Sequence, residues 1–188
     1  MIENIVDRIA TRRGLWVFGC ATACLFLFFN VSPFGVPRFR QYTHIPGPGA
    51  GMLDLQFACS PERIYRLLAE YGDGGRHYYF FLLAVDFVFP VVYGLFLAAV
   101  LRVFARRAFS SDSRWMNLYV IPLLVGGCDY LENLGILTLL LSFPRRLFAV
   151  ALLTSVFTTS KWILSGVAGV AIVVVGMLSL GPAAKEAK

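Results

Sequence analysis

The sequence predicts an all-α integral membrane protein: a bundle of four transmembrane helices with one extramembrane loop that carries a short amphipathic helix. Of the 188 residues, 58% are hydrophobic, and the mean hydropathy is +0.71, whereas soluble domains contain roughly 45–50% apolar residues. Several apolar runs exceed the roughly 18 residues that mark a candidate spanning helix. The sequence shows no internal repeat, so residues 1–188 are expected to form a single membrane domain.

The N-terminal part of the chain contains the first predicted span. Residues 1–13 are polar and end in Arg12-Arg13, and residues 14–32 form an apolar run. A charged start followed by a hydrophobic stretch is also the pattern of a secretory signal. No small-residue cleavage site follows this run, which ends at Pro33. We therefore predict a retained helix over residues 14–32.

The extramembrane loop is predicted to cover residues 33–76. It opens with a stretch rich in proline and glycine, residues 33–51, where we expect no regular structure. Ser60-Pro61-Glu62 then has the composition of a helix N-terminus, with a capping hydroxyl followed by a first-turn proline and acid. Apolar residues recur at helical spacing until Gly72 and Gly74-Gly75, where we expect the helix to end. These residues are Ile64, Leu67, Leu68 and Tyr71. The resulting amphipathic helix is expected to lie on the membrane surface or to cover the bundle.

Three further apolar runs complete the predicted bundle. The second span, 78–101, opens with an aromatic cluster at the membrane interface. A basic loop separates it from the third span, 118–141, and a short turn precedes the fourth span, 147–178. The tail after Pro182 is short and polar.

The positive charge of the chain is best explained by membrane topology. Net charge is +6, with 17 Lys and Arg residues that lie mostly in the short segments between apolar runs. Nine of them fall in the N-terminal segment, the 102–114 loop and the tail, and seven fall on the opposite side. The positive-inside rule therefore favours a multi-pass protein of the plasma (inner) membrane with both termini in the cytoplasm. We do not expect nucleic acid as a partner.

The cysteine and histidine residues show no cofactor or metal pattern. Cys20 and Cys24 lie inside the first apolar run and Cys128 lies inside the third, so only Cys59 falls in a loop. No C-x-x-C motif and no cysteine–histidine zinc spacing occurs. We therefore expect neither a cofactor nor a bound metal. The two histidines, His44 and His77, are expected to be solvated or interfacial.

Candidate catalytic residues come from ionisable side chains inside the apolar runs. Asp86 lies in the second run, Asp129 and Glu132 lie in the third, and Lys161 lies in the fourth. A charge at the centre of a spanning helix costs roughly 2.5–3.5 kcal/mol on insertion scales, so these side chains are expected to point into the bundle. We predict that Asp129 or Glu132 pairs with Lys161. Three carboxyls with one ammonium would carry a formal charge of −2, so either one or two carboxyls bind a proton, Asp86 first, or a cation, water or cationic ligand enters the cluster.

Neighbouring polar residues are candidate ligand-binding groups. Residues at i, i+3, i+4 and i+7 share a helix face, which aligns Tyr93 with Asp86, Asn133 with Asp129, and Thr158 with Lys161. A purely structural network that fixes helix register remains an alternative for all of these side chains. Asp54, in the extramembrane loop, is expected to serve a turn or a cap.

Three functions are compatible with this pattern. The first is a small intramembrane enzyme or binding protein that acts on a lipid or another hydrophobic molecule, with the carboxyls as general acid and base and Lys161 as their electrostatic partner. The second is a proton- or cation-coupled transport module that works as a homo-oligomer, with small residues in close helix contacts: Gly126, Gly127, Gly166 and Gly169. The third is a non-catalytic membrane assembly subunit whose docking surface is the 52–76 segment. A pocket that ends at the carboxyls would favour the enzyme.

Overall fold

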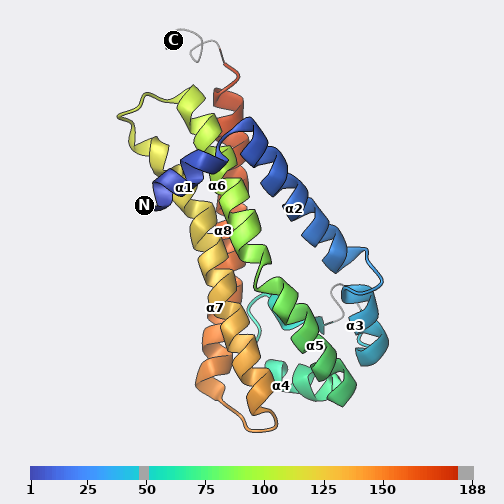
Figure 1. Cartoon of the computed structure of the whole chain (residues 1–188). Helices are drawn as coiled ribbons and strands as arrows, with labels where there is room; N and C mark the ends of the chain where they lie inside the picture. Colours follow the sequence, from blue (N-terminus) through green and yellow to red (C-terminus); the bar gives the residue numbers. More distant parts are fainter. Residues whose placement is uncertain (47–50, 182–188) are drawn as a thin grey trace.

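The computed structural model describes residues 1–46 and 51–181, and within these ranges every regular element is a helix. Figure 1 shows the arrangement of the helices. In chain order they are α1 (Ile2–Ile9), α2 (Arg12–Asn30), α3 (Val36–Thr43), the 3₁₀ helix η2 (Leu53–Leu55), α4 (Pro61–Glu70), α5 (Gly72–Asp86), α6 (Phe89–Ala108), the 3₁₀ helix η3 (Arg114–Tyr119), α7 (Val120–Ser142) and α8 (Phe148–Leu178).

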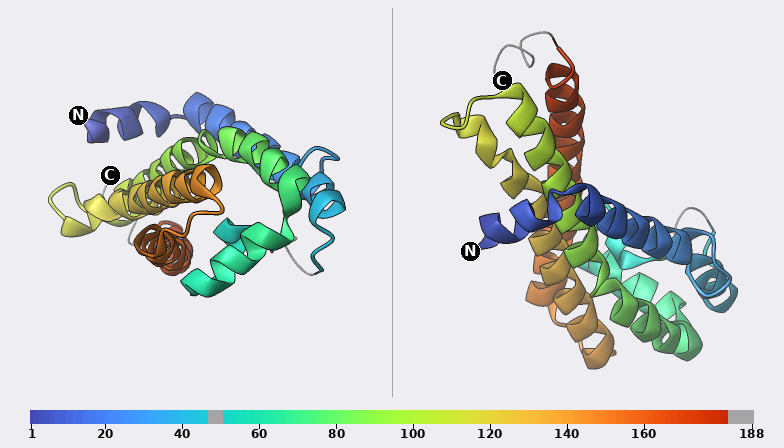
Figure 2. Two further views of the ribbon diagram at one scale, coloured as in Figure 1. Left: turned by 90° about the horizontal axis from the view of Figure 1, so that it is seen from below. Right: turned by 45° about the horizontal axis from the view of Figure 1, so that its top comes forward.

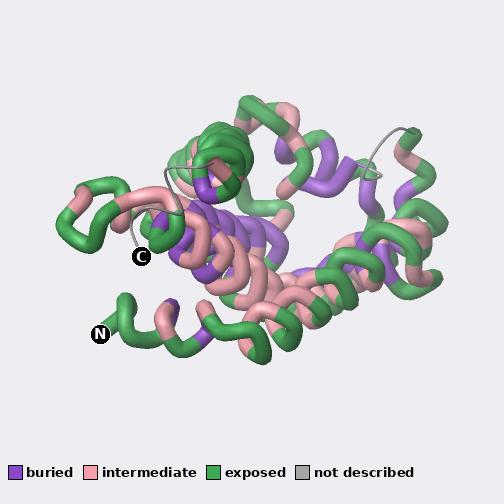
Figure 3. The backbone as a smooth tube through the Cα atoms, turned by 90° about the horizontal axis from the view of Figure 1, so that it is seen from above, coloured by how far each residue is buried: buried purple, intermediate pink, exposed green. Residues whose placement is uncertain are grey.

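Four helical segments of the described chain are long and apolar enough to cross a membrane, as the sequence predicts. They are Arg12–Asn30, Gly72–Ala108, Arg114–Ser142 and Phe148–Leu178. Helices α7 and α8 lie side by side along most of their length, and α6 packs on both (Figures 1 and 2). Buried positions lie where the helices face one another, and the outward turns are exposed (Figure 3).

The N-terminal segment forms a helix of its own. Helix α1 packs against α6, and Arg102 of α6 pairs with both Glu3 and Asp7 of α1. Thr11 then caps α2, because its hydroxyl accepts a hydrogen bond from the Gly14 amide. Figure 1 shows that α1 lies toward the end of the bundle where α6 and α8 finish.

The stretch 33–51 was predicted to be irregular, and this prediction is wrong for its first part. Helix α3 occupies Val36–Thr43 and carries Pro37 in its first turn, where a missing N–H breaks no helical hydrogen bond. Phe39 holds the helix in place, because its fully buried ring packs against the rings of Tyr71 and Tyr79. The predicted irregularity at residues 47–50 lies outside the described residues.

Helix α4 forms as predicted, and Ser60 accepts a hydrogen bond from the Arg63 amide at its start. Leu67 and Leu68 are fully buried, and the Leu147 amide donates to the hydroxyl of Tyr65. The amphipathic helix thus covers one end of the bundle, next to the turn between α7 and α8 (Figure 1).

Helix α4 ends at Glu70, just before Gly72, as predicted, but a second helix, α5, begins at Gly72 and continues through Gly74-Gly75. Gly72 adopts a left-handed conformation with φ of +61° and makes the sharp turn between α4 and α5. A Cβ at Gly74 or Gly75 would lie 3.2 or 3.1 Å from side chains of α3. These glycines therefore allow close packing of α3 on α5 and do not end a helix.

The second predicted span is interrupted. Helix α5 ends at Asp86 and α6 begins at Phe89, with Pro90 in its first turn. Proline has no amide hydrogen, so Pro90 cannot bond to the carbonyl oxygen four residues earlier, which belongs to Asp86. The chain changes direction at this point (Figure 1).

Of the four glycines expected to permit close helix contacts, Gly126 makes such a contact within the described chain. A Cβ at Gly126 would lie 2.9 Å from the Pro90 carbonyl oxygen, so α6 and α7 cross closely there. By contrast, a Cβ at Gly127, Gly166 or Gly169 would meet no atom within 4 Å. These three glycines therefore make no close helix contact within the described chain. The pattern missed Gly135, where a Cβ would lie 2.1 Å from the Thr154 hydroxyl oxygen.

Candidate functional site

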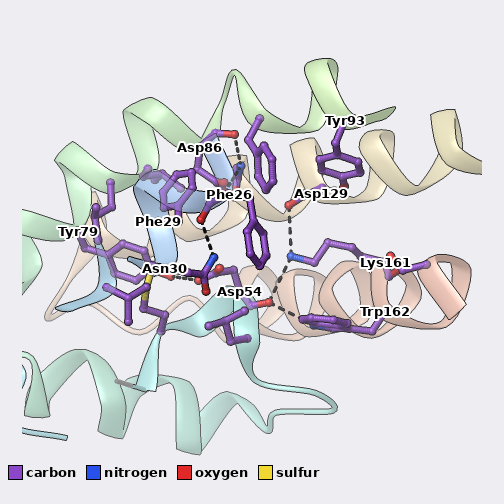
Figure 4. Close-up of a pocket in the computed structure, with 18 residues that line it drawn as sticks. Phe26, Phe29, Asn30, Asp54, Tyr79, Asp86, Tyr93, Asp129, Lys161 and Trp162 are labelled. Atoms are coloured by element: carbon purple, nitrogen blue, oxygen red, sulfur yellow. Dashed lines mark hydrogen bonds and ion pairs between the residues drawn. The ribbon is translucent and has the colours of Figure 1, made fainter. Parts of the chain in front are cut away.

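A cavity of about 300 Å³ lies between α2, η2, α5, α6, α7 and α8. Most of its wall is apolar, and exposed side chains from α2 and α8, such as Phe26 and Trp162, lie at its margin. Figure 4 shows the polar end of the cavity, where side chains from η2 and from α2, α5, α6, α7 and α8 converge. The polar residues of the wall are Asn30, Asp54, Tyr79, Asp86, Tyr93, Asp129, Asn133, Lys161 and Ser165.

Lys161 is the centre of the charged cluster. Its Nζ atom lies 3.2 Å from Asp129 Oδ1 and 2.6 Å from Glu132 Oε2, so the predicted pairing with a carboxyl of α7 is confirmed and involves both candidates. The same Nζ donates to the backbone carbonyl of Asp54 at 3.2 Å. The ammonium thus joins α8 to α7 and to the loop.

The two α7 carboxyls differ in their access to the cavity. Asp129 lines it, and its Oδ2 atom accepts a 2.7 Å hydrogen bond from the hydroxyl of Tyr93. Glu132 is fully buried behind the wall, where Thr158 donates to its Oε1 atom at 2.7 Å. Glu132 and Thr158 therefore support the cluster without lining the cavity, and their catalytic and ligand-binding roles stay predictions.

Asp86 occupies the break between α5 and α6. Its Oδ2 atom accepts a 2.9 Å hydrogen bond from Nδ2 of Asn133, and the same Nδ2 lies 3.4 Å from the Asp86 carbonyl oxygen that Pro90 cannot bond. The side chain of Asn133 is fully buried, and its Oδ1 atom has no hydrogen-bond partner among the described residues. An unpartnered acceptor thus lies next to the Asp86 carboxyl.

Asp54 belongs to the cluster, a role that the sequence analysis did not assign. It lies in the short turn η2, as predicted, but its side chain caps no helix. Instead, its Oδ1 atom accepts a 2.8 Å hydrogen bond from the hydroxyl of Tyr79, and its carbonyl accepts one from Trp162 at 3.3 Å. Burial raises the pKa of this carboxyl above 3.8, although the attraction of Lys161 opposes the shift. The signal in the sequence that could have indicated this role is an acid between two leucines. In the structure Leu53 is buried, and Asp54 next to it lines the cavity.

The cluster carries an excess of negative groups. Asp54, Asp86 and Asp129 line the cavity, Glu132 lies behind it, and Lys161 is their single cationic neighbour among the described residues. Within this part of the chain no group of three or more side chains is arranged to hold a metal ion. His77 is exposed, with Nδ1 2.8 Å from the Asp73 carbonyl oxygen, as expected for an interfacial histidine.

This arrangement suits proton transfer to or from a molecule in the cavity. Carboxyls held by neutral donors, such as Asn133 for Asp86 and Tyr93 for Asp129, are positioned groups of the kind that general acid–base chemistry uses.

No family model, no curated protein and no solved structure matches the chain.

Proposed function

We propose that this chain is a four-span integral membrane protein that binds a lipid or another hydrophobic molecule in the cavity and acts on its polar end by proton transfer. The observation that carries the proposal is the composition of the cavity wall. The wall is mostly apolar, and its polar part is the place where charged residues converge: Asp54, Asp86, Asp129 and Lys161. Ligand pockets generally have this composition, with a few convergent polar groups in an apolar surface.

The exposed surface supports insertion in a membrane. Large apolar side chains of α8 point outward along the helix, and in a water-soluble protein such a continuous patch would be unstable. The most exposed of them include Leu152, Leu153, Ile163, Val170, Val173 and Met177. The end of the bundle with α1 also carries Arg106 and Arg107, which favours a cytoplasmic location for both termini.

Lateral access supports a membrane-derived ligand. The main contacts of α2 are with α1, α3 and α6, and its Phe26 is 54% exposed, while Trp162 of α8 is 44% exposed. Both side chains border the cavity. A molecule with an apolar tail would therefore pass from the lipid between these two helices to the carboxyls.

The proposed chemistry assigns separate roles to the charged residues. Asp86 and Asp129 face the cavity and are the proposed general acid and base, and Tyr93 positions Asp129. Lys161 stabilises negative charge on Asp129 and Glu132. A positioned general acid or base typically contributes about 10²–10⁴-fold to the rate.

The test is mass spectrometry of small molecules that co-purify with the protein in neutral detergent. The wild type is compared with Asp86→Asn, with the double variant Asp129→Asn plus Glu132→Gln, and with Asp112→Asn as a control in an exposed loop. We expect one class of hydrophobic molecule with the wild type and the control, and its loss from the site variants. The same molecule retained by folded site variants, or no bound molecule in any sample, would contradict the proposal. Thermal unfolding of each variant identifies those that fail to fold.

The break between α5 and α6 supports a second candidate, transport coupled to protons or cations. Transporters often bind their ions where a spanning helix is interrupted, and Asp86 is the last residue before this break. Such a module is expected to form a homo-oligomer, since four helices rarely enclose a complete path. Proton uptake by liposomes that contain the purified protein, abolished by Asp86→Asn, would favour this function. The cavity supports both of these functions, and it gives no support to the third, a non-catalytic assembly subunit.

A further inference from the structure

The hydrogen-bond donors of the cavity wall are already used within the protein. A lysine ammonium has three N–H donors. Nζ of Lys161 donates to Asp129 Oδ1 and to the carbonyl of Asp54, each at 3.2 Å, and forms an ion pair with Glu132 Oε2 at 2.6 Å. The hydroxyls of Tyr79 and Tyr93 donate to Asp54 and Asp129. A ligand therefore finds few free donors at the polar end.

The acceptors of the same wall are not all used. Asn133 is fully buried, its Nδ2 atom donates to Asp86, and its Oδ1 atom has no partner among the described residues. A buried polar atom without a partner destabilises the folded protein, because it has lost its hydrogen bonds to water. Among the described residues the buried side-chain atoms without a hydrogen-bond partner are this atom and Oε2 of Glu132, and of the two residues only Asn133 lines the cavity. A bound N–H or O–H group would satisfy it.

The charge of the cavity wall favours a hydrogen-bond donor that is also a cation. Within the described residues Lys161 pairs with Asp129 and Glu132, and no ion pair involves the carboxyl of Asp54 or Asp86. A cation that enters the cavity would lie near both of these carboxyls, whereas an anion would be repelled. Aromatic rings also line the cavity and attract cations through their faces. They are Phe26, Phe29, Tyr79, Phe89, Tyr93 and Trp162.

We infer that the ligand of this cavity is a single-chain amphiphile with a protonated amine at its polar end, and that the ammonium N–H groups bind Asp86 and Asn133. This inference rests on the proposed function and adds the chemical class of the ligand. A quaternary ammonium would satisfy the charge but has no N–H for Asn133. The volume of about 300 Å³ lies at the lower end of ligand pockets, which favours one alkyl chain over a two-chain lipid.

The test measures the binding of four probes with the same alkyl chain to the purified full-length protein in a neutral maltoside detergent. The probes are octylamine, octyltrimethylammonium, octanol and octanoate, and their affinities are measured by calorimetric titration at pH 7. At this pH a primary amine is protonated, since its pKa is about 10. We expect octylamine to bind at least tenfold more tightly than each of the other three.

Variants locate the binding site. Asp86→Asn is expected to lower the octylamine affinity at least tenfold and to leave the octanol affinity within about twofold, and Asn133→Leu is expected to remove the preference for octylamine over octyltrimethylammonium. Asp112→Asn, in an exposed loop, should bind all probes as the wild type does. If Asp86→Asn does not fold, Asp54→Asn replaces it, since Asp54 faces the same cavity.

The outcomes separate this inference from the proposed function. Equal affinities for octylamine and octanol, or tightest binding of octanoate, would overturn the ammonium inference and leave a hydrophobic pocket in place. Octylamine affinity unchanged in the folded Asp86→Asn variant would also overturn it. Binding of no probe at all would overturn both.

Discussion

The side-chain nitrogen Nδ2 of Asn133 lies 2.9 Å from the carboxyl oxygen Oδ2 of Asp86, and this hydrogen bond joins α7 to the last residue of α5. The same nitrogen reaches the Asp86 carbonyl oxygen, which the following Pro90 leaves without its helical donor. One side chain of α7 thus supports both the backbone break and the carboxyl of the proposed site.

A double-mutant cycle should detect this contact. We expect Asp86→Ala and Asn133→Ala to be non-additive in the free energy of unfolding, because each substitution removes the same side-chain hydrogen bond. Coupling energies of such bonds in membrane proteins average about 0.6 kcal/mol and reach about 1.7 kcal/mol. Chemical unfolding of the two single variants and the double variant in detergent gives the coupling. Strict additivity would contradict the contact.

Lys161→Met should destabilise the protein strongly. The substitution leaves Asp129 and Glu132, both buried, without their cation, and removal of one partner of a buried pair costs about 3–5 kcal/mol. The variant with Asp129→Asn and Glu132→Gln added should regain much of this stability, because it contains no unpaired buried charge at these positions. Arg107→Met, at an exposed position of α6, serves as the control in the same thermal unfolding assay.

Two adjacent glycines provide a matched pair for the crossing of α6 and α7. Gly126→Ala should destabilise by about 1–3 kcal/mol, because its Cβ would lie 2.9 Å from the Pro90 carbonyl oxygen and the backbone must shift. Gly127→Ala should be neutral or stabilising by up to about 1 kcal/mol, because its Cβ meets no atom and alanine favours helix. Equal unfolding temperatures for both variants would be evidence against the close crossing.

Asp54 should make stability depend on pH. Its pKa in the folded state is raised by burial above 3.8, so the folded state binds this proton more tightly than the unfolded state does. The contribution is fully present below pH 3.8 and is lost as pH rises through the folded pKa. The wild type should therefore lose stability relative to Asp54→Asn as pH increases over that window.

Groups that face Asp54 set the size of this effect. Lys161 and the hydroxyl of Tyr79 lower the pKa of Asp54, whereas Asp129 raises it. Tyr79→Phe removes a donor to the carboxylate and should extend the loss of stability to higher pH. The measurement is the difference in unfolding free energy between each variant and the wild type across a pH series. A difference that does not change with pH would show that Asp54 is not perturbed.

The helical class, the number of long apolar helices and most of the charged residues in the cluster can be predicted from the sequence alone. Runs such as Phe148–Leu178 are continuous and apolar, so length and composition alone define them. The carboxyls of α7 and Lys161 were identifiable because a charge in such a run needs a partner inside the bundle. The cap of α4 was equally local, since Ser60 and Pro61 are adjacent in the sequence.

How these residues come together in a site depends on contacts between distant parts of the chain. The carbonyl of Asp54 meets Lys161, a residue 107 positions later in the chain, and periodicity within one segment carries no information about such a contact. Helix α3 persists in a segment rich in proline because the buried ring of Phe39 packs on α4–α5 residues far along the sequence. The cavity is likewise lined by side chains of α2, α5, α6, α7 and α8, and a pocket is a property of packing between helices and not of any one of them.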